Sequence, residues 1–394
     1  MSVVTFDHVD VIFGPDPSTA FAMLDQGADR AEIAESTQNV IAVHDASLEV
    51  ADGDICVLMG LSGSGKSSLL RCVNGLNKVS RGRVLVRYAD RQIDVTSCDR
   101  KTLHRLRTDC ISMVFQHFAL MPWRSIIENV AFGLELSGMS KTERRRIVEE
   151  KLEMVRLANW ADKYPHQLSG GMQQRVGLAR ALATDATILL MDEPFSALDP
   201  LIREHLQDEL IQIQENLKKT IIFVSHDLDE ALKLGSSIAI MEAGRIVQIG
   251  SPEEIVSNPV NEYVSRFVAS MNPIKVLRCA SLLRPVRDLK QSENKDRIFE
   301  LDPAGQCVCR LDSDGRPDLI TLSGAALNLI YLQNDTDLQG LPRGGIVMAE
   351  IETPMKAVIE INHFTGLPVP VLDSAGKLLG VVGPAEIFRG ILRE

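Results

Sequence analysis

One stretch of the chain, residues 60–68, has the residue types and spacing of a loop that surrounds phosphate groups. It reads Gly-Leu-Ser-Gly-Ser-Gly-Lys-Ser-Ser and fits the pattern G-x-x-x-x-G-K-[ST] without a mismatch. It also stands where such a loop must stand, directly after the apolar run 55–59 and before the helix-like segment 66–74. That context favours phosphate binding over a glycine- and serine-rich turn that binds nothing.

The residue types of this loop indicate its chemistry. Its glycines lack the Cβ that would prevent backbone N–H groups from pointing inward at a polyphosphate such as ATP, and the following helix directs its positive dipole end at the same anion. Lys66 would reach the β- and γ-phosphates, and the Ser67 hydroxyl would take one position on Mg²⁺. The predicted nucleotide-binding residues of the loop are Gly60, Leu61, Ser62, Gly63, Ser64, Gly65, Lys66, Ser67 and Ser68.

Polar side chains stand at the ends of three further predicted strands. These are Gln116, the pair Asp192 and Glu193, and His226. The carboxyl ends of parallel strands face a ligand crevice, so Asp192 would hold Mg²⁺ and Glu193 would reach the water that attacks the γ-phosphate. Gln116 could give an oxygen to Mg²⁺ or hold that water. Taken singly, each is also compatible with a surface or structural role, but the repeated placement predicts one site.

Two helix starts contain further candidates. Residues 168–175 read Leu-Ser-Gly-Gly-Met-Gln-Gln-Arg, where Ser169 is a good N-cap. Gly170 and Gly171 leave the first N–H groups of the helix open to a phosphate, although as a lone motif this would be only a helix start. Asp199 lies in a Ser-Ala-Leu-Asp-Pro turn that leads into another predicted helix.

An aromatic residue ends the first predicted strand, residues 3–13. Phe13 is a candidate to stack on an adenine ring, because an aromatic face binds a purine without base-specific hydrogen bonds. A phenylalanine of the core or of a sheet edge is the alternative. A helix-like insertion at 16–37 separates this strand from the next one, at 40–50.

The elements between these motifs alternate between strands and helices, which predicts an α/β domain. Residues 82–95 are interpreted as a hairpin that turns at 89–91. Residues 121–164 have helical periodicity and dense charge, which indicates a helical insert within this domain. A helix near 257–270 is expected to close it.

Composition excludes several classes of protein. The 394 residues exceed one ordinary core, so two or three domains are expected. A formal net charge of −11 argues against nucleic acid as a partner, and no apolar run approaches the roughly 18–20 residues that span a bilayer. The N-terminus lacks the features of a signal peptide.

Seven cysteines without a C-x-x-C pair indicate reduced thiols, and Cys307 and Cys309 are interpreted as same-face strand residues rather than metal ligands.

The composition changes after residues 272–273. Residues 291–318 are polar and charged, so a linker or small irregular domain is expected to begin near 275–285. A helix is predicted at 354–359, and a β–turn–β–α unit follows from residue 369 to 392. This last unit is too small to be an enzyme.

The set of motifs resembles the ATP-binding subunits of ABC transporters, in order and spacing, over residues 1–270. The insertion at 16–37 and the segments 115–122 and 196–203 are similar to the quaternary-ammonium importers for glycine betaine, proline betaine or choline. The resemblance implies an ATPase, with ATP and Mg²⁺ as cofactors, that powers import of choline or a betaine, choline being the first candidate. It implies a P-loop NTPase fold with a RecA-like core, an antiparallel β-subdomain and a helical subdomain, followed by a small α+β CBS-like domain.

The resemblance also implies an assembly at the cytoplasmic face of the inner membrane. Two copies would sandwich two ATP molecules head to tail, with the signature 168–172 of each completing the site of the other. Glu193 would polarise the water, His226 would bridge toward the γ-phosphate, and Asp199 would couple the two sites. Integral-membrane permease subunits would dock on 117–165, and an extracytoplasmic solute-binding protein would act with them.

The implied domains are an ATP-binding domain at 1–275 with a helical subdomain at 117–165, a linker or degenerate CBS-like region at 276–349, and a CBS-like module at 350–394. Two alternatives stay open. One is the ATPase of a transporter for another solute, including an exporter. The other is a non-transport ABC ATPase acting on DNA or ribosomes, which the single cassette and the net negative charge disfavour.

Overall fold

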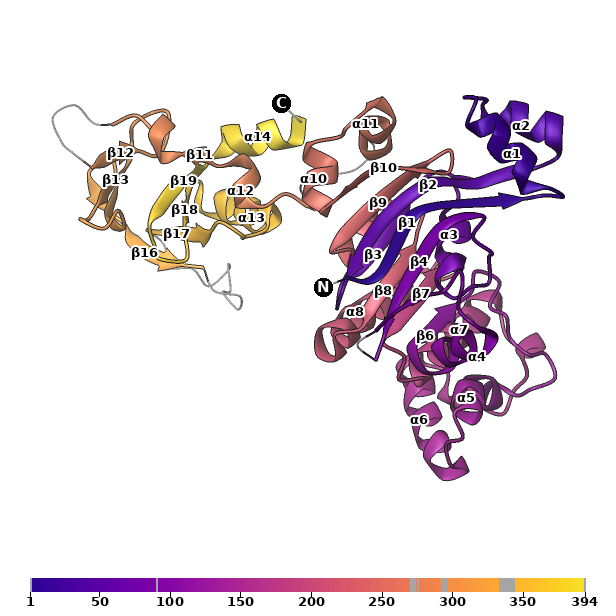
Figure 1. The fold of residues 1–394 in the computed structure, drawn as a ribbon. Helices are drawn as coiled ribbons and strands as arrows, with labels where there is room; N and C mark the ends of the chain where they lie inside the picture. Colours follow the sequence, from indigo (N-terminus) through magenta and orange to yellow (C-terminus); the bar gives the residue numbers. More distant parts are fainter. Residues whose placement is uncertain are drawn as a thin grey trace. The chain divides into compact units, whose positions relative to one another are not determined.

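The chain forms two compact units, Met1–Ala269 and Ser270–Glu394, shown in Figure 1. The computed structural model describes residues 2–89, 91–269, 274, 276–291, 297–332 and 344–392. Within this described part of the chain, no helix is both long enough and apolar enough to cross a membrane.

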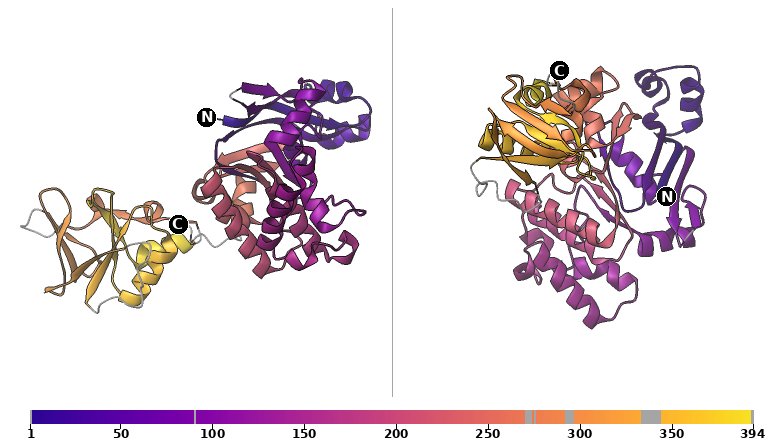
Figure 2. Two further views of the ribbon diagram at one scale, coloured as in Figure 1. Left: turned by 90° about the horizontal axis from the view of Figure 1, so that it is seen from below. Right: turned by 90° about the vertical axis from the view of Figure 1, so that its left-hand side faces the viewer.

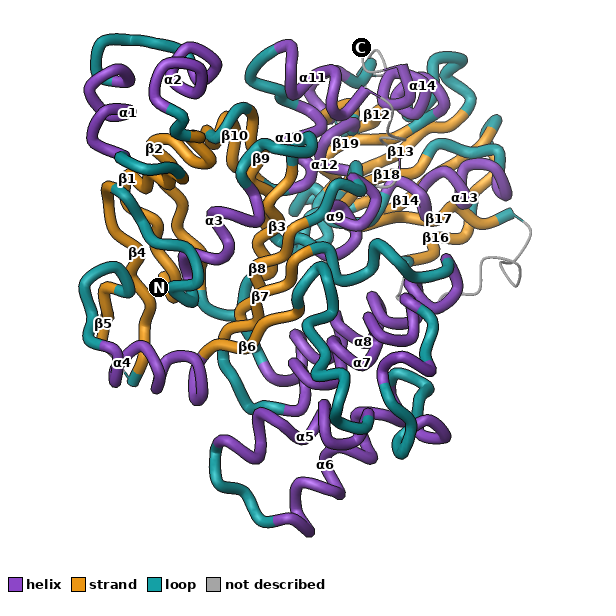
Figure 3. The backbone as a smooth tube through the Cα atoms, turned by 90° about the vertical axis from the view of Figure 1, so that its right-hand side faces the viewer, coloured by secondary structure: helices purple, strands orange, loops and turns teal. Residues whose placement is uncertain are grey.

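The first unit is built around a six-stranded sheet. Its strands are β3 (Ile55–Met59), β6 (Ile111–Val114), β7 (Ile188–Asp192), β8 (Thr220–Val224), β9 (Ser237–Glu242) and β10 (Arg245–Gly250). Their spatial order is β10-β9-β3-β8-β7-β6, which can be followed in Figure 3. All neighbours pair in parallel except β10 with β9. Val57 and Leu58 belong to different hydrophobic cores, because successive side chains of a strand point to opposite faces. The sheet is therefore covered on both sides.

A second, antiparallel sheet covers one of these faces. It consists of β1 (Ser2–Phe13), β2 (Val40–Ala51), β4 (Arg81–Tyr88) and β5 (Arg91–Asp94). Val4 and Val50 of this sheet share a core with Leu70 of α3 (Lys66–Val73) and with Leu58. The hairpin prediction is confirmed by the pairing of β4 with β5, although Asp90 of its turn lies outside the described residues. The helix α4 (Arg100–Arg105) and a π-helical turn then lead to β6.

The other face is covered by helices. The predicted helical insert contains α5 (Ile126–Leu136) and α6 (Lys141–Met154), which pack against each other and against α7 (Gly170–Ala183). The helices α8 (Pro200–Leu217) and α9 (Leu228–Leu234) follow β7 and β8 in the chain. The helix predicted near 257–270 is confirmed as α11 (Glu262–Ala269), but it begins later than predicted. Pro259 lacks an N–H and disfavours helical backbone in the residue before it, and a separate helix, α10 (Pro252–Ser257), ends before this proline. Ser270 of the predicted span lies outside the described residues.

The predicted insertion between the first two strands forms α1 (Pro17–Leu24) and α2 (Arg30–Thr37). A buried carboxylate, Asp10, lies beside it in the antiparallel sheet. One Asp10 oxygen is 2.7 Å from His44 Nδ1, and the other accepts from Arg81 Nε over 2.7 Å. The Arg81 guanidinium also lies 4.5 Å from the ring centroid of Phe21 in α1. These contacts attach the insertion to β1, β2 and β4.

The second unit contains two sheets. One has the order β12-β13-β14-β15, with β12 (Ile298–Glu300), β13 (Cys307–Leu311), β14 (Pro317–Leu322) and β15 (Ala325–Ala326). The other has the order β11-β19-β18-β17-β16, with β11 (Arg284–Pro285), β16 (Asn328–Tyr331), β17 (Gly345–Glu350), β18 (Val369–Leu372) and β19 (Leu378–Val382). Its helices are α12 (Cys279–Leu282), α13 (Met355–Thr365) and α14 (Pro384–Leu392), the last two yellow in Figure 2.

The predicted boundaries of the tail were at residues 275 and 349. In the structure the second unit begins at Ser270, and β11 and β16 from the first part of the tail share one sheet with β18 and β19 from the last part. The polar segment 291–318 also contains β12 and β13. As predicted, Cys307 and Cys309 lie on the same, buried face of their strand. Backbone pairing and a few alternating buried residues suffice for such strands, so a segment of high average polarity can still form a sheet.

The contacts of Asp10 generate a test of stability. Asp10→Ala should lower the free energy of unfolding by about 2–3 kcal/mol, because it leaves His44 and Arg81 without a buried partner. Asp7→Ala is the matched control, since Asp7 pairs with Arg83 in an exposed ion pair that should contribute about 1 kcal/mol or less. Denaturant unfolding of both variants measures the difference, and equal losses would contradict the assignment.

The stabilisation by Asp10 should also depend on pH. Burial raises the pKa of Asp10, but hydrogen bonds from His44, Arg81 and the backbone of Asp45 outweigh it and lower this pKa below the ordinary aspartate value. A carboxyl with a lowered pKa in the folded state stabilises that state above its ordinary pKa. The difference between wild type and Asp10→Ala should therefore shrink as the pH falls from the ordinary pKa toward the lowered one.

Candidate functional site

The phosphate loop connects β3 to α3 through three residues of left-handed backbone. Gly60, Gly63 and Gly65 have φ values of +143°, +78° and +99°. A Cβ on Gly60 would lie 2.1 Å from the Met241 carbonyl oxygen, and one on Gly65 would lie 2.2 Å from that of Ala42. Glycine is therefore required at both positions by conformation and by close approach.

Lys66 lies inside the loop, with 6% of its surface exposed. Its Nζ donates to the carbonyl oxygens of Gly60, over 2.8 Å, and Leu61, over 2.9 Å. Burial lowers the pKa of Lys66, and the carboxylates of Glu193 and Asp192 oppose this shift. The ammonium group is thus placed in the concave side of the loop, where a phosphate would meet it.

The structure brings Ser67 and Asp192 together, as the prediction of a shared Mg²⁺ requires. Ser67 Oγ donates to Asp192 Oδ1 over 2.6 Å, and Arg71 Nη2 donates to Asp192 Oδ2 over 2.8 Å. Asp192 is completely buried, so its charge depends on these donors. A hydroxyl and a carboxylate are the hard oxygen ligands that Mg²⁺ prefers, and the donor set fits that ion.

Sequence reasoning missed Arg71, the ion-pair partner of Asp192. A signal was present, since Arg71 lies four residues after Ser67 and α3 begins at Lys66. Residues four apart share one face of a helix. Any group that Ser67 contacts was therefore within reach of Arg71 also.

Three of the predicted strand-end residues meet at Glu193. Glu193 Oε2 is 3.3 Å from Gln116 Nε2 and 3.4 Å from His226 Nδ1. The backbone of Glu193 is in the left-handed region, with φ at +48°, and its N–H donates to the Val224 carbonyl over 3.1 Å. This unusual conformation turns the chain at the end of β7 and is held by the surrounding structure. The Glu193 carboxylate, which directly follows β7, is thereby contacted by one side chain that follows β6 and one that follows β8.

A second residue that sequence reasoning missed holds the segment after Glu193. Gln174 of α7 is 1% exposed. Its Nε2 donates to the Glu193 carbonyl over 3.0 Å, and its Oε1 accepts from the Ala197 N–H over 3.0 Å. The available signal was helical spacing, because Gln174 shares a face with buried Leu178 and Ala181.

The two predicted helix starts lie at the surface. Ser169 caps α7 by accepting from the Met172 N–H, and Asp199 caps α8 by accepting from the Ile202 N–H over 3.1 Å. Gly171 is packed closely, since a Cβ there would lie 2.8 Å from the Ala197 carbonyl oxygen. Ser169, Gly170 and Asp199 are exposed. The capping hydrogen bonds of Ser169 and Asp199 do not connect them to the phosphate loop.

Phe13 is 44% exposed at the end of β1, opposite Val40 of β2. Its prediction as an adenine-stacking residue stays a prediction. Its ring is accessible, which that role requires.

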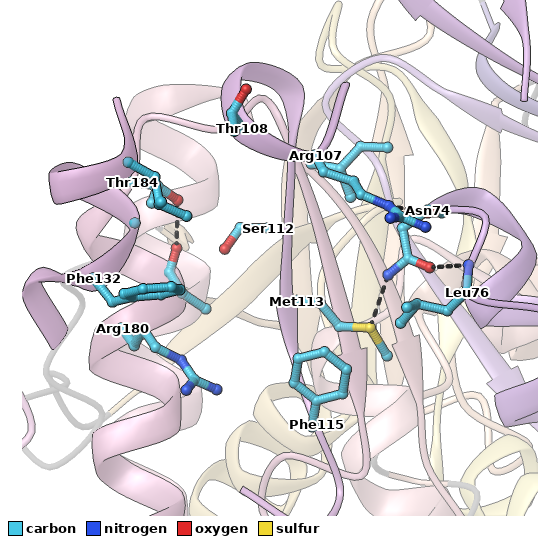
Figure 4. A pocket seen from close by; sticks show the side chains of 14 residues that line it. Asn74, Leu76, Arg107, Thr108, Ser112, Met113, Phe115, Phe132, Arg180 and Thr184 are labelled. Carbon is cyan, nitrogen blue, oxygen red and sulfur yellow. Dashed lines mark hydrogen bonds between the residues drawn. The ribbon is translucent and has the colours of Figure 1, made fainter. Parts of the chain in front are cut away.

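A cavity of about 260 Å³ lies beside the strand that delivers Gln116. Figure 4 shows Met113 and Phe115 of this strand region facing Phe132 of α5 and Arg180 of α7 across it. Arg180 donates to the carbonyl oxygens of Phe118 and Ala119, and burial lowers its pKa. The cavity is therefore bounded by the sheet on one side and the helical subdomain on the other.

The parallel sheet, the phosphate loop and the polar groups at the strand ends define a nucleotide-binding ATPase. The ABC transporter family matches residues 43–196, and a family described as AAA domain, putative AbiEii toxin, Type IV TA system, matches residues 163–232. A solved dimeric ATP-binding cassette in a post-hydrolysis state with ADP and phosphate is 31% identical, with a TM-score of 0.55 over 63% of this chain and 98% of that one.

Three relatives extend the likeness to nearly the whole chain. The glycine betaine/carnitine transport ATP-binding protein GbuA of Listeria monocytogenes is 40% identical over 97% of this chain and 96% of its own length. The glycine betaine/proline betaine protein ProV of Escherichia coli is 39% identical over the same shares. The trimethylamine N-oxide protein TmoW of Ruegeria pomeroyi is 44% identical over 81% of this chain and 97% of its own length.

The chain belongs to the ATP-binding proteins of ABC transporters. It is an ATPase with the P-loop NTPase fold, as the sequence predicted.

The contacts of Gln174 predict a defect in hydrolysis. Gln174→Met keeps the side-chain volume but removes the hydrogen bonds of Gln174 to Glu193, Ser196 and Ala197, which frees this segment. We expect kcat for ATP hydrolysis to fall about tenfold or more while the KM for ATP changes little, because sub-ångström placement of the reacting groups is lost. Gln214→Met is the control, since Gln214 bonds to the Gly53 carbonyl at the opposite end of β3. Equal kcat values in the two variants would contradict the role of Gln174.

Proposed function

We propose that this ATPase powers the import of a quaternary ammonium compound, with glycine betaine as the first candidate. The support comes from the relatives, which are named as transport proteins for glycine betaine, carnitine, proline betaine and trimethylamine N-oxide. These solutes share a nitrogen with no N–H. Choline shares it also, but these names favour a betaine over the choline that was first expected.

Two copies of the chain would form the working ATPase. The support is the dimeric state of the solved cassette and the exposure of Ser169, Gly170 and Asp199, which leaves them available to a second copy. Lys66 and the loop N–H groups of one copy would bind the phosphates of ATP, and the signature helix of the other would close over them. Binding would close the dimer, and hydrolysis would open it.

Within each site the residues of this chain would divide the chemistry. Ser67, Asp192 and Gln116 would hold Mg²⁺, which neutralises charge on the phosphates. Glu193 would accept a proton from the attacking water or orient it, and His226 would contact the γ-phosphate. The 3.4 Å approach of His226 to Glu193 supports their shared role.

Permease subunits in the membrane would dock on the helical subdomain and the adjoining cavity, and the chain would lie at the cytoplasmic face. The support is that the cavity and the ATP site are adjacent in the chain, because Phe115 lines the cavity and the next residue, Gln116, contacts Glu193. A displacement of Gln116 on binding or loss of the γ-phosphate would therefore also move Phe115 in the cavity wall, since one peptide bond joins the two residues. An extracytoplasmic binding protein would select the solute together with the permease.

The second unit would regulate or stabilise this assembly. The order of β17, α13, β18, β19 and α14 supports the CBS-like interpretation, which was drawn from the sequence of the last module alone. The match to GbuA includes this unit, since it covers 97% of the chain.

Glu193→Gln tests the chemistry. The variant should bind ATP with nearly unchanged affinity, lose hydrolysis by about 100-fold or more, and accumulate as a dimer in ATP, because the amide cannot accept the proton of water. Size-exclusion chromatography and phosphate release measure both outcomes, with Glu242→Gln at the end of β9 as the matched control. Hydrolysis at the wild-type rate would show that Glu193 has another role.

Uptake in cells tests the solute. Cells that express the native chain with its permease should accumulate labelled glycine betaine, and replacement by Glu193→Gln should abolish that accumulation. Proline betaine and choline are measured in parallel. If none of the three depends on the native chain, the quaternary ammonium assignment fails and the ATPase assignment stands.

A further inference from the structure

The hydroxyl of Tyr263 contacts the phosphate loop from outside the loop. Tyr263 belongs to α11, the last helix of the first unit. The Leu61 N–H donates to this hydroxyl over 3.3 Å, and the hydroxyl donates to the Met241 carbonyl, in β9, over 3.2 Å. The Tyr263 ring stacks on Phe267, with 6.1 Å between the centroids. A helix that is remote in sequence is thereby joined to the start of the ATP-binding loop.

This contact fixes the peptide plane that also holds the loop lysine. The Leu61 N–H and the Gly60 carbonyl belong to the same trans peptide, so they point in opposite directions. Tyr263 accepts from the N–H, and Lys66 Nζ donates to the carbonyl over 2.8 Å. The two side chains hold the plane from its two sides. A rotation of this plane would move an oxygen that positions the Lys66 ammonium.

The surroundings of the hydroxyl support this role. The Met241 carbonyl, which accepts from Tyr263, is the same group that leaves no room for a Cβ on Gly60. Burial raises the pKa of Tyr263, the Leu61 N–H opposes the shift, and Glu242 adds to it. The hydroxyl therefore stays protonated at neutral pH and can donate to Met241 while it accepts from Leu61.

We propose that Tyr263 is a positioning residue that holds the Gly60–Leu61 peptide for Lys66. The inference rests on the ATPase assignment and is independent of the transported solute. No reacting group is supplied by Tyr263. Its effect on ATP runs through Lys66.

Tyr263→Phe in the full chain tests the positioning role. The variant keeps the ring and its stacking but removes the hydroxyl, so the KM for ATP should rise about two- to tenfold, the range for losing one neutral hydrogen bond, while kcat changes less. Tyr88→Phe is the matched control, because its hydroxyl donates to Asp109, in the turn before β6, away from the loop. A KM equal to that of the control would overturn the proposal. If Tyr263→Phe and Tyr88→Phe lose the same thermal stability, the difference between their KM values still decides, because the loss of stability is then common to both variants.

Since ATP hydrolysis is the readout for both variants, failure of this proposal is distinguishable from failure of the solute assignment.

Discussion

Parallel pairing of neighbouring strands is the constraint on which the site depends. β3, β8, β7 and β6 run in the same direction side by side, so their carboxyl ends meet at one edge of the sheet. Gln116 and Glu193 are 77 residues apart in the chain, yet their side chains lie within hydrogen-bonding distance. The backbone continues the register beyond the last strand residue, because the Glu193 N–H donates to the Val224 carbonyl. The sheet therefore determines the distances between the reacting groups.

The buried carboxylate of Asp192 is the second constraint on the site, because it requires hydrogen-bond donors. Asp192 is fully buried at the end of an apolar strand, and an isolated carboxylate there would be strongly disfavoured. Ser67 and Arg71 of α3 supply its donors, so the phosphate-binding helix and the strand with the acidic pair are joined by the same contacts that keep the carboxylate charged. A strand and a helix from distant parts of the chain thus form a single polar centre.

Unusual backbone conformations also occur at this edge, where contacts from outside the edge hold them. Glu193 is in a left-handed conformation that a side chain disfavours, and Gln174 holds its carbonyl from α7. The start of the phosphate loop is held in the same way by Tyr263 of α11. Both supports are neutral hydrogen bonds from helices that contribute no reacting group. The geometry of the site is therefore open to influence from the helical subdomain and from the end of the first unit.

The sequence by itself determined the phosphate loop, the polar strand ends, the α/β class and the family. Each depends on local spacing: glycines before a Lys-Ser pair, apolar runs of strand length, and a carboxylate pair at the end of one run. The signature motif was also visible, since it is contiguous in the chain. No knowledge of distant contacts was needed for these.

Only the tertiary structure decided which residues support the site and how the tail folds. Arg71, Gln174 and Tyr263 act through partners 121, 19 and 202 residues away. Helical spacing places Arg71 and Gln174 on particular helix faces, but no local pattern identifies the partners of these three residues. The pairing of the strands between residues 298 and 331 was not visible for a related reason, although a strand at Cys307 and Cys309 was predicted: sheet pairing is made by backbone groups that every residue has, and only a few alternating side chains are buried. Long-range pairing, unlike a loop motif, leaves little trace in residue type.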